Sequence, residues 1–428
     1  MPERIVIVGA GVAGILLATK LGRHYSNSGS ATVTLIDKSP THVWKPMLHT
    51  IAAGTHDIHH QQVILLAHAR ENGYRYVRGE MVGLDRSGRT ITLSEMMGPD
   101  GSRMLSSRSL DYDVLILAVG STANDFGVSG ITQHCHFIDS QRQAEAFNLA
   151  LRARAARSID RDEPLRITVV GGGATGVELS AELSRLLEVA STYGHASLRE
   201  RLELTLFEAG PRLLPAFPEK ISAASQARLE EIGIRVRTAT AVSAATGEGF
   251  AYGDGRFVES DLMVWAAGVK APDFMASLDG LETNRSNQIP VRSTLQSMND
   301  ERVFAIGDCA SLTLTGDARP LAPTAQVATQ QAEHLARQLP RWLKRDTIPE
   351  FQFRDFGALV TLSDYDAFGV LGKLGLYRGG CIRGYLAKLG HVMVYRRHQK
   401  AVHGLGKATL LWSTEKLNSW VRPQIRLV

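Results

Sequence analysis

Two short glycine-rich segments constrain this chain more than any other feature. Residues 5–14 read IVIVGAGVAG and residues 169–180 read VVGGGATGVELS, so in each an apolar run ends in glycines and a helix-like stretch follows. A glycine-rich turn between a strand and a helix brings backbone N–H groups close to a pyrophosphate, because no Cβ stands in the way. One such turn binds one dinucleotide, so the sequence predicts two bound dinucleotides.

The first glycine segment has the surroundings of a dinucleotide site. The pattern predicts a strand over 4–8, a helix from about 12 to 24 and a second strand over 32–37 that ends in Asp37. A carboxylate there accepts hydrogen bonds from adenosine ribose hydroxyls. The glycines at GxGxxG spacing are Gly9, Gly11 and Gly14.

The second glycine segment repeats this pattern. A strand over 165–170 leads to the glycines, a helix carries Glu178, and the strand LELTLFE ends in Glu208. The stretch between loop and acid is longer than in the first unit, which predicts a longer helix and connection. We expect the dipole of that helix to favour the charged form of Glu178. The loop glycines are Gly171, Gly173 and Gly176.

Three further segments have the pattern of buried strands that close in small residues. They are VLILAVGSTAN (114–124), LMVWAAGVKAP (262–272) and RVFAIGDCAS (302–311). Glycine at a strand end often marks close approach of another backbone or a ligand. Ligands of open α/β sheets bind at the carboxyl ends of the strands. The candidate contacts are Ala118, Gly120, Ala267, Gly268, Gly307 and Asp308.

Composition narrows the class of protein. The chain has 428 residues, 44% of them hydrophobic and 21% charged, which suits two or three globular domains. Its three cysteines, Cys135, Cys309 and Cys381, are far apart and show neither a disulfide framework nor a metal-ligand spacing. This pattern favours a reducing, cytoplasmic compartment and predicts no metal site.

Positive charge is concentrated near the C-terminus. From Lys373 onward the chain has eleven Lys and Arg residues and one acid, Glu415. No nucleic-acid-binding motif accompanies them, so we expect no nucleic-acid partner, whereas anionic lipid headgroups attract the same charges. No apolar run approaches the roughly 18 residues of a transmembrane helix, so we expect a chain that does not span the membrane.

These strand-end motifs, in this order, resemble the two-dinucleotide-binding flavoprotein superfamily. The resemblance implies an α/β fold with two Rossmann-like domains, the NADH domain being inserted in the FAD domain, plus a C-terminal membrane-associating region. It implies non-covalent FAD at the first loop, NAD(P)H at the second, and Asp308 on the flavin ribityl chain. The implied ranges are 1–120 and 291–345 for the FAD domain, 121–290 for the NADH domain and 346–428 for the C-terminal region.

Cysteine spacing separates the enzyme classes of this superfamily. A disulfide relay needs two close cysteines beside the flavin, and the chain has neither CxxC nor CxxxxC. A sulfide:quinone reductase also uses a cysteine pair beside the flavin. This enzyme class remains an alternative, because cysteines that are distant in sequence can meet in the folded chain. The intact second loop favours NAD(P)H as the electron donor.

The segment LAPTAQVATQQAEHLARQL (321–339) bears on the electron acceptor. Gln326 and Gln330 are four residues apart and share a helix face, and a glutamine amide can donate to and accept from a quinone carbonyl. The segment resembles the AQxAxQ stretch that lies at the flavin and lines the quinone site in type II NADH:quinone oxidoreductases. HVWKPMLHTIAAG (42–54) is similar to the flavin-side segment of that family. The resemblance adds Lys38, Lys45, Pro46 and Ala325 to the expected cofactor contacts.

The resemblance implies a respiratory enzyme that pumps no protons. It passes hydride from NADH to FAD and two electrons to a ubiquinone- or menaquinone-type quinone. Glu178 is expected near nicotinamide and flavin with a proton or charge-transfer role. Glu208 favours NADH over NADPH, a preference that Arg212 could soften. A ferredoxin or rubredoxin reductase and an NAD(P)H-sensing flavoprotein with little turnover remain as alternatives.

The C-terminal segments 398–412 and 421–428 resemble proteobacterial members of the same family. We expect residues from about 373 to anchor the protein peripherally on the cytoplasmic face of the cell membrane, where a long-tailed quinone resides. A homodimer is left open. The residues expected on one apolar helical side are Leu410, Leu417, Trp420 and Val421.

Overall fold

The computed structural model describes residues 1–55, 62–98, 100–192, 196–372 and 380–421. The chain divides into two compact units, each formed from three separate segments. The first unit comprises 1–44, 62–122 and 269–354, and the second 45–61, 123–268 and 355–428.

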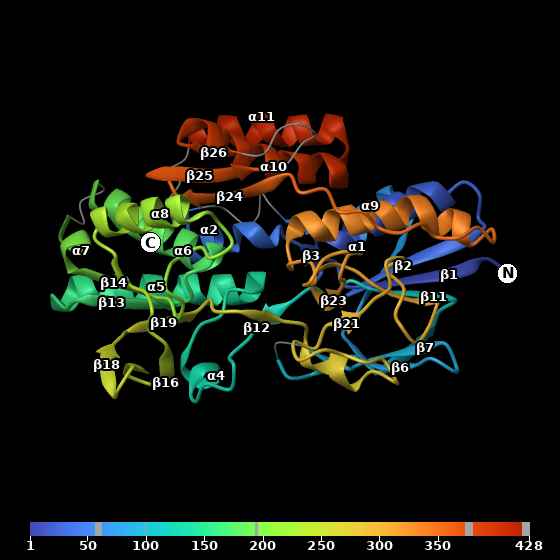
Figure 1. Cartoon of the computed structure of the whole chain (residues 1–428), viewed down its shortest axis with the longest axis horizontal. Helices are drawn as coiled ribbons and strands as arrows, with labels where there is room; N and C mark the ends of the chain where they lie inside the picture. The colour runs from blue at the N-terminus through green and yellow to red at the C-terminus, as the bar shows by residue number, and fades with distance from the viewer. Residues whose placement is uncertain (56–61, 99, 193–195, 373–379, 422–428) are drawn as a thin grey trace. The chain divides into compact units, whose positions relative to one another are not determined.

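A parallel five-stranded sheet forms the centre of the first unit, with the order β22-β11-β1-β2-β5 (Figure 1). Its strands are β1 (Glu3–Val8), β2 (Ala31–Asp37), β5 (Arg75–Arg78), β11 (Val114–Leu117) and β22 (Val303–Ala305). Helix α1 (Val12–Tyr25) follows β1 and packs against α9 (Ala325–Trp342). Because β1 has a parallel partner on each side, its apolar residues are buried and the first glycine loop lies at the carboxyl end of the sheet.

Short elements complete the first unit. An antiparallel sheet of order β10-β7-β6 consists of β6 (Met81–Asp85), β7 (Thr90–Leu93) and β10 (Arg108–Asp111). The other elements are β3 (Thr41–His42), β4 (Val63–Ile64), α3 (Leu65–Glu71), β8 (Met96–Met97), β9 (Arg103–Leu105), η3 (Asp273–Ser277), β21 (Ile289–Pro290), η4 (Gly307–Cys309) and β23 (Ala310–Ser311). The chain leaves this unit through β12 (Thr122–Ala123) and returns through β20 (Val269–Lys270).

The second unit contains a parallel four-stranded sheet of order β15-β14-β13-β19. The strands are β13 (Leu165–Val170), β14 (Leu202–Phe207), β15 (Arg235–Arg237) and β19 (Leu262–Trp265). The helices of this part are η1 (Lys45–Met47), α2 (Leu48–Ala53), α4 (Ile131–His134), α5 (Gln141–Arg161), α6 (Ala174–Thr192), α7 (Ala196–Arg201) and α8 (Glu219–Glu231). An antiparallel sheet is formed by β16 (Val242–Thr246), β17 (Gly249–Tyr252) and β18 (Arg256–Glu259).

The C-terminal part of the second unit is a small antiparallel sheet followed by two helices, drawn in orange and red in Figure 1. The sheet comprises β24 (Gly357–Leu362), β25 (Asp366–Leu371) and β26 (Gly380–Arg383), and the helices are α10 (Tyr385–His403) and α11 (Leu405–Val421). Helix α10 packs on β24 and β25, and β24 in turn packs on α6. Among the helices that the structure describes, none has both the length and the apolar character of a membrane-spanning segment.

The predicted elements around both glycine loops are present. The helix expected over 12–24 is α1, and the long connection expected before Glu208 is α6 followed by α7. The unit boundaries differ from the expected 120, 290 and 345, since the chain changes unit after 44, 61, 122, 268 and 354. Residues 45–61 and 355–428 join the second unit because α2 and β24 both pack on α6. Residues 422–428 and the side chain of Trp420 lie outside the described part.

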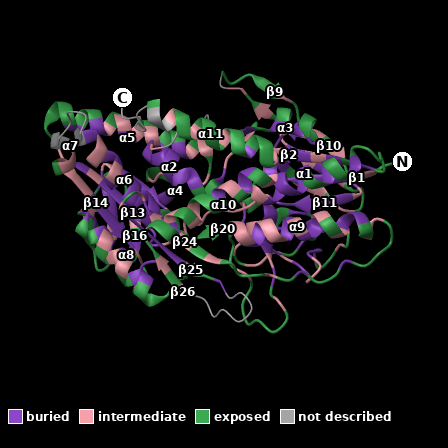
Figure 2. Ribbon diagram, turned by 90° about the horizontal axis from the view of Figure 1, so that it is seen from above, coloured by how far each residue is buried: buried purple, intermediate pink, exposed green. Residues whose placement is uncertain are grey.

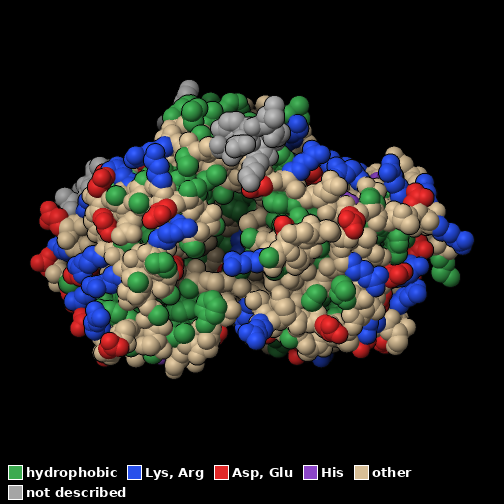
Figure 3. All heavy atoms as spheres, in the orientation of Figure 1, with side chains coloured by type: hydrophobic (Ala, Val, Ile, Leu, Met, Phe, Trp, Pro, Cys, Tyr) green, Lys and Arg blue, Asp and Glu red, His purple; other side chains and the backbone are tan. Residues whose placement is uncertain are grey.

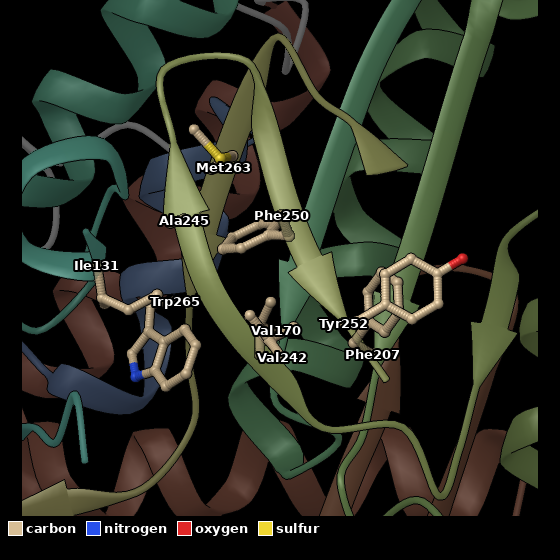
Figure 4. Packing of buried hydrophobic residues seen from close by; sticks show 9 residues of the cluster. All are labelled: Ile131, Val170, Phe207, Val242, Ala245, Phe250, Tyr252, Met263 and Trp265. Carbon is tan, nitrogen blue, oxygen red and sulfur yellow. The ribbon is translucent and has the colours of Figure 1, made fainter. Parts of the chain in front are cut away.

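Most strand residues of both large sheets are buried, as the purple ribbons in Figure 2 show, whereas the edge strands β5 and β15 are largely exposed or partly exposed. In the second unit, Phe250 on β17 has no exposed surface and lies among apolar side chains from the parallel sheet, including Val170, Phe207 and Met263 (Figure 4). This cluster attaches the β16-β17-β18 sheet to the parallel sheet that carries the second glycine loop.

We predict that Phe250→Ala lowers the free energy of unfolding of the second unit by about 3–5 kcal/mol, because the residual cavity adds to the lost transfer energy. Chemical denaturation followed by circular dichroism measures the change. Phe257→Ala on the neighbouring strand is the control, because that ring is already 45% exposed. Equal destabilisation by both variants would contradict the assignment of this core.

Candidate functional site

Two glycines close the first loop, and a third leaves space in front of it. Gly9 has φ +102°, and a Cβ there would lie 2.3 Å from the carbonyl oxygen of Ala118. A Cβ on Gly14 would lie 1.8 Å from the carbonyl oxygen of Gly9. A Cβ on Gly11 would lie 3.9 Å from that same Ala118 oxygen, an ordinary van der Waals distance. Gly9 and Gly14 are therefore required by packing, whereas Gly11 leaves room for a ligand.

Asp37 is held at the end of β2 by backbone donors from the loop. The N–H of Ala10 donates to its Oδ2 at 2.6 Å and the N–H of Ser39 to its Oδ1 at 2.7 Å. Burial raises the pKa of the Asp37 carboxyl, and both N–H donors oppose that shift. Each oxygen has a second lone pair, so the carboxylate can still accept a ribose hydroxyl.

Two further strand ends of the first unit come together. The hydroxyl of Ser121 donates to Oδ2 of Asp308 at 2.7 Å, which joins the segment after β11 to η4. Gly120 and Gly307 have φ values of +72° and +73°, a region that favours glycine. A Cβ on Gly120 would have no atom within 4 Å. The structure thus gathers Ala118, Gly120, Gly307 and Asp308 at the carboxyl edge of the sheet.

Helix α9 contributes a residue that sequence reasoning missed. Gln331 is 1% exposed, and its Oε1 accepts the N–H of Gly307 at 2.7 Å. It lies on the buried stripe of α9 beside Val327 and Ala328, and a polar residue on such a stripe signals a buried hydrogen bond. Gln331 therefore fixes the turn that presents Asp308.

The two expected quinone contacts differ in their surroundings. The amide of Gln330 forms a pair of hydrogen bonds with the backbone of Arg354, at 2.8 Å from Nε2 and 3.0 Å to Oε1. Gln326, one turn earlier, is half-buried, and helix α9 begins at Ala325 with Thr324 as its N-cap. Gln330 thus anchors the segment that leads to β24, and a quinone contact for either side chain stays a prediction.

Of the three residues that the resemblance added before α2, Lys38 belongs to the first unit and Lys45 and Pro46 to the second. Lys38 forms an exposed ion pair with Glu80 at 2.8 Å. Lys45 and Pro46 belong to η1, and Nζ of Lys45 lies 3.8 Å from Oδ1 of Asp139. Flavin contact by these residues stays a prediction.

The second loop repeats the geometry of the first. Gly171 has φ +119°, and a Cβ there would lie 2.6 Å from the backbone carbon of Ala266. A Cβ on Gly176 would lie 1.9 Å from the carbonyl oxygen of Gly171. A Cβ on Gly173 would meet nothing within 4 Å. Two glycines again close the turn, and one leaves open space.

Glu208 occupies the position that Asp37 has in the first unit. Its Oε2 accepts the N–H of Gly172 at 2.7 Å and its Oε1 the N–H of Gly210 at 2.6 Å. Gly172 was not singled out from the sequence, although a Cβ there would lie 2.8 Å from Glu208. Arg212 donates to the carbonyl oxygens of Leu214, Pro215 and Phe217. Its guanidinium is thus engaged within its own loop.

Ala267 and Gly268 follow the strand that packs on the second loop. Gly268 has φ +64°, and a Cβ there would lie 2.3 Å from the ring of Phe126. Phe126 itself has φ +52° and is 63% exposed. The carbonyl oxygen of Asn124 accepts the Nε1–H of Trp265 at 2.8 Å, which fastens the Phe126 loop to β19. The positive φ therefore favours glycine at position 268, and the Phe126 ring lies over it.

Glu178 lies in the second turn of α6 and is 7% exposed. Its Oε1 accepts the backbone N–H of Thr361 at 3.0 Å, and its Oε2 lies 3.7 Å from Nδ1 of His49. Burial raises the pKa of this carboxyl to about 8, against the lowering effect of Thr361. The expectation of a dipole-stabilised charge was wrong, because the dipole acts mainly in the first turn and burial outweighs it.

The three cysteines do not have the properties of a redox pair. All three are free thiols: Cys309 is buried, Cys135 is partly buried and Cys381 is exposed. Burial raises the pKa of Cys135 to about 12 and that of Cys309 to about 11. A thiol of such pKa is protonated near neutral pH and is a poor nucleophile. The structure gives no support to thiol chemistry at these positions.

Each unit thus fits one dinucleotide. In both, a glycine turn at the carboxyl edge of a parallel sheet has open space over one glycine, and an acid at the end of the next strand is fixed by two N–H donors. The acid suits an adenosine ribose and the N–H-rich turn suits a pyrophosphate. In the first unit, Asp308 adds an acceptor for hydroxyls of a second part of the ligand.

Comparison with known proteins agrees with this arrangement. The family model for pyridine nucleotide-disulphide oxidoreductases matches residues 3–332. A type II NADH:quinone oxidoreductase of Haemophilus influenzae is 37% identical, covering 99% of this chain and 100% of that protein. One of Staphylococcus aureus is 30% identical, covering 87% of this chain and 90% of that protein.

A solved structure shares the whole fold. NDH2 from Plasmodium falciparum in complex with NADH is similar with a TM-score of 0.84, 18% identity and coverage of 100% of both chains. The curated relatives add sequence identity over nearly the full length. The chain therefore belongs to the pyridine nucleotide-disulphide oxidoreductase family and, within it, to the type II NADH:quinone oxidoreductases.

Proposed function

We propose that this protein binds FAD at the first glycine loop and NADH at the second, and oxidises NADH with a quinone as electron acceptor. The observation that carries the proposal is the repeated glycine turn with its fixed acid, in a chain 37% identical to a type II NADH:quinone oxidoreductase. Bound FAD supplies the chemistry, accepting hydride from NADH and returning two electrons to the quinone.

The residues of the chain bind and orient the two dinucleotides. Asp37 and Glu208 accept ribose hydroxyls, and the turns at Gly11 and Gly173 receive the pyrophosphates. Asp308 accepts hydroxyls of the ribityl chain, held by Ser121 and by the Gln331 contact to Gly307. Because Arg212 is engaged by three carbonyl groups, it offers no ready partner for a 2′-phosphate, and we propose NADH as the donor.

The alternatives fit less well. A sulfide:quinone reductase needs reactive thiols, whereas the pKa of Cys135 and of Cys309 is raised. A sensor of NAD(P)H would need the two dinucleotide loops but no site for an electron acceptor. Gln326 on α9 remains the proposed quinone contact, while Gln330 acts through its hold on Arg354.

We further propose that α10 and α11 bring the protein to a lipid surface, where the quinone dissolves. The apolar outer face of α10 comprises Tyr385, Leu386, Leu389, Val392 and Met393, from 44% exposed at Val392 to 78% at Tyr385. It lies opposite the buried side of that helix, which includes Ala387 and Val402. Hydrophobic side chains gather over this region in Figure 3.

Helix α11 adds further exposed apolar side chains to this surface, and the C-terminal region carries an excess of positive charge. Leu410 and Leu417, expected on one side, are 65% and 60% exposed, and Val421 is 81% exposed. The single acid Glu415 is paired with Arg396. The positive excess therefore remains for an anionic lipid surface, at roughly 1 kcal/mol per Lys or Arg near it. We place this surface on the cytoplasmic side, where NADH is available.

The proposed function is tested by NADH oxidation with a short-chain quinone. The FAD-loaded protein is expected to turn over NADH steadily with quinone and to show little activity with a disulfide or a ferredoxin. Activity with ferredoxin that exceeds quinone activity would contradict the assignment.

We predict that Glu208→Gln lowers kcat/KM for NADH by about tenfold to a hundredfold, since a charge-assisted hydrogen bond contributes roughly 1.5–3 kcal/mol. Activity with NADPH should fall less, because the repulsion of the 2′-phosphate is relieved. Glu203→Gln at the other end of β14 is the control, since that side chain pairs with Arg235. An unchanged NADH-to-NADPH ratio would place Glu208 away from the ribose.

We predict that the triple variant Leu386→Gln, Leu389→Gln and Met393→Gln reduces binding to anionic vesicles at least tenfold, since burying such a side chain contributes about 1.5–3 kcal/mol. Vesicle cosedimentation measures it. Leu149→Gln on α5 is the control, because that residue is 61% exposed on another helix.

Sedimentation velocity distinguishes lipid binding by the outer face of α10 from dimer formation through the same face. If the wild-type chain dimerises, the triple variant is monomeric and vesicle binding is unchanged, then the outer face of α10 is an interface between copies and the lipid assignment is wrong.

A further inference from the structure

Two buried carboxyl groups lie one turn apart on α6: Glu178, for which the resemblance implied a proton or charge-transfer role, and Glu182, to which no role has been assigned. Glu178 is 7% exposed and Glu182 8%. Residues four apart share a helix face, so the two carboxyls are neighbours. Two neighbouring carboxylates in a low-dielectric interior resist being ionised together, and they titrate as a pair. Near neutral pH this pair therefore holds a proton.

The hairpin of β24 and β25, here called the C-terminal hairpin, supplies a hydrogen-bond donor to each of the two acids. The N–H of Thr361, near the end of β24, donates to Oε1 of Glu178 at 3.0 Å. Ser363, in the turn that follows, hydrogen-bonds with the side chain of Glu182 and has φ +51°. A non-glycine residue in this region of φ is strained and persists only where the surroundings impose it. The hairpin thus fixes the positions of both carboxyl groups by hydrogen bonds.

The environment of Glu182 suits both of its protonation states. Oγ1 of Thr55 lies 2.9 Å from Oε2 of Glu182 and 3.3 Å from the carbonyl oxygen of Thr50. When Glu182 is ionised, the Thr55 hydroxyl donates to it. When Glu182 is protonated, it donates to Oγ1 and the hydroxyl turns to Thr50, since a hydroxyl both donates and accepts. Thr55 is only partly buried, so the relay reaches toward solvent.

The charged and titratable groups around the pair come from three elements. His49 on α2 lies 3.7 Å from Glu178. Asp364, after β24, raises the pKa of Glu182, and Arg185 on α6 lowers it. The Arg185 guanidinium itself binds Glu188 and Asp364. Burial is the largest effect and raises the pKa of both acids, to about 8 for Glu178.

Quinone reduction by NADH consumes a proton: NADH + H⁺ + quinone → NAD⁺ + quinol. We propose that Glu182 is a positioning residue that keeps a proton on Glu178 and replaces it after use. The proton consumed in the reaction leaves the Glu178 carboxyl. A proton from water then reaches the ionised Glu182 by way of Thr55 and passes on to Glu178, so that Glu182 is ionised again. This inference rests on the proposed function for the reaction but not for the proton-holding pair itself.

The pair is tested first without turnover. Difference infrared spectroscopy of the FAD-loaded protein follows the protonated-carboxyl band between pH 5 and pH 10. In Glu182→Gln the band of Glu178 is expected to titrate at a lower pH than in wild type, because a neighbouring negative charge is removed. Glu188→Gln is the control, since that acid lies on the same helix with 38% of its side chain exposed. An unchanged titration of Glu178 in Glu182→Gln would overturn the proposal.

Turnover is measured separately by stopped flow. With Glu182→Gln, flavin reduction by NADH should match wild type, while reoxidation by quinone above neutral pH should slow about tenfold for each unit by which the pKa of Glu178 falls. Glu182→Asp should restore part of the rate. If Glu182→Gln fails to fold, Thr55→Val tests the relay instead, because it removes the hydroxyl through which the proton returns to Glu182, and quinone reoxidation should again slow. If the infrared titration of Glu178 shifts as expected but the wild-type protein does not turn over quinone, the proposed function is wrong and the proton-holding pair stands. If wild type and variants are reoxidised by quinone at equal rates, the relay is wrong.

Discussion

The structure depends on one interaction that occurs twice: a backbone N–H of a glycine turn donates to a carboxylate at the end of the next strand, and an N–H two residues after the acid donates to its other oxygen. Asp37 receives Ala10 and Ser39, and Glu208 receives Gly172 and Gly210. The contact forms only because Gly9 and Gly171 let the turn pass against the strand at Ala118 and Ala266. A side chain at either glycine would push the turn away and leave the acid without its donors.

Helix α6 links the second turn to the C-terminal part of its unit. Its N-terminal end carries the turn, and its second and third turns carry two acids that the C-terminal hairpin contacts. The same hairpin supports α10, whose outer face is apolar and exposed. One helix thus joins nucleotide binding, proton holding and the proposed lipid surface.

Local sequence predicted the elements around both loops, because strand, glycine spacing and terminal acid all act over short distances. It also predicted that Gly307 and Asp308 lie at the carboxyl end of a strand, although not that Asp308 meets Ser121. It did not predict Gln331 or the hold of Gln330 on Arg354, because these contacts join segments that only the folded chain brings together. The charge state expected for Glu178 was wrong for the same reason, since its burial comes from α2 and β24, which are distant in sequence.

The central claim, one dinucleotide for each loop, is tested most directly by binding stoichiometry in loop variants. Gly173→Val should be accommodated by the fold, because a Cβ there meets nothing within 4 Å, yet it fills the space proposed for a pyrophosphate. Absorbance for FAD and calorimetry with NAD⁺ should give one of each per wild-type chain, and FAD alone in Gly173→Val. Loss of FAD together with NAD⁺ from a folded variant, or displacement of FAD by NAD⁺ in wild type, would contradict the account.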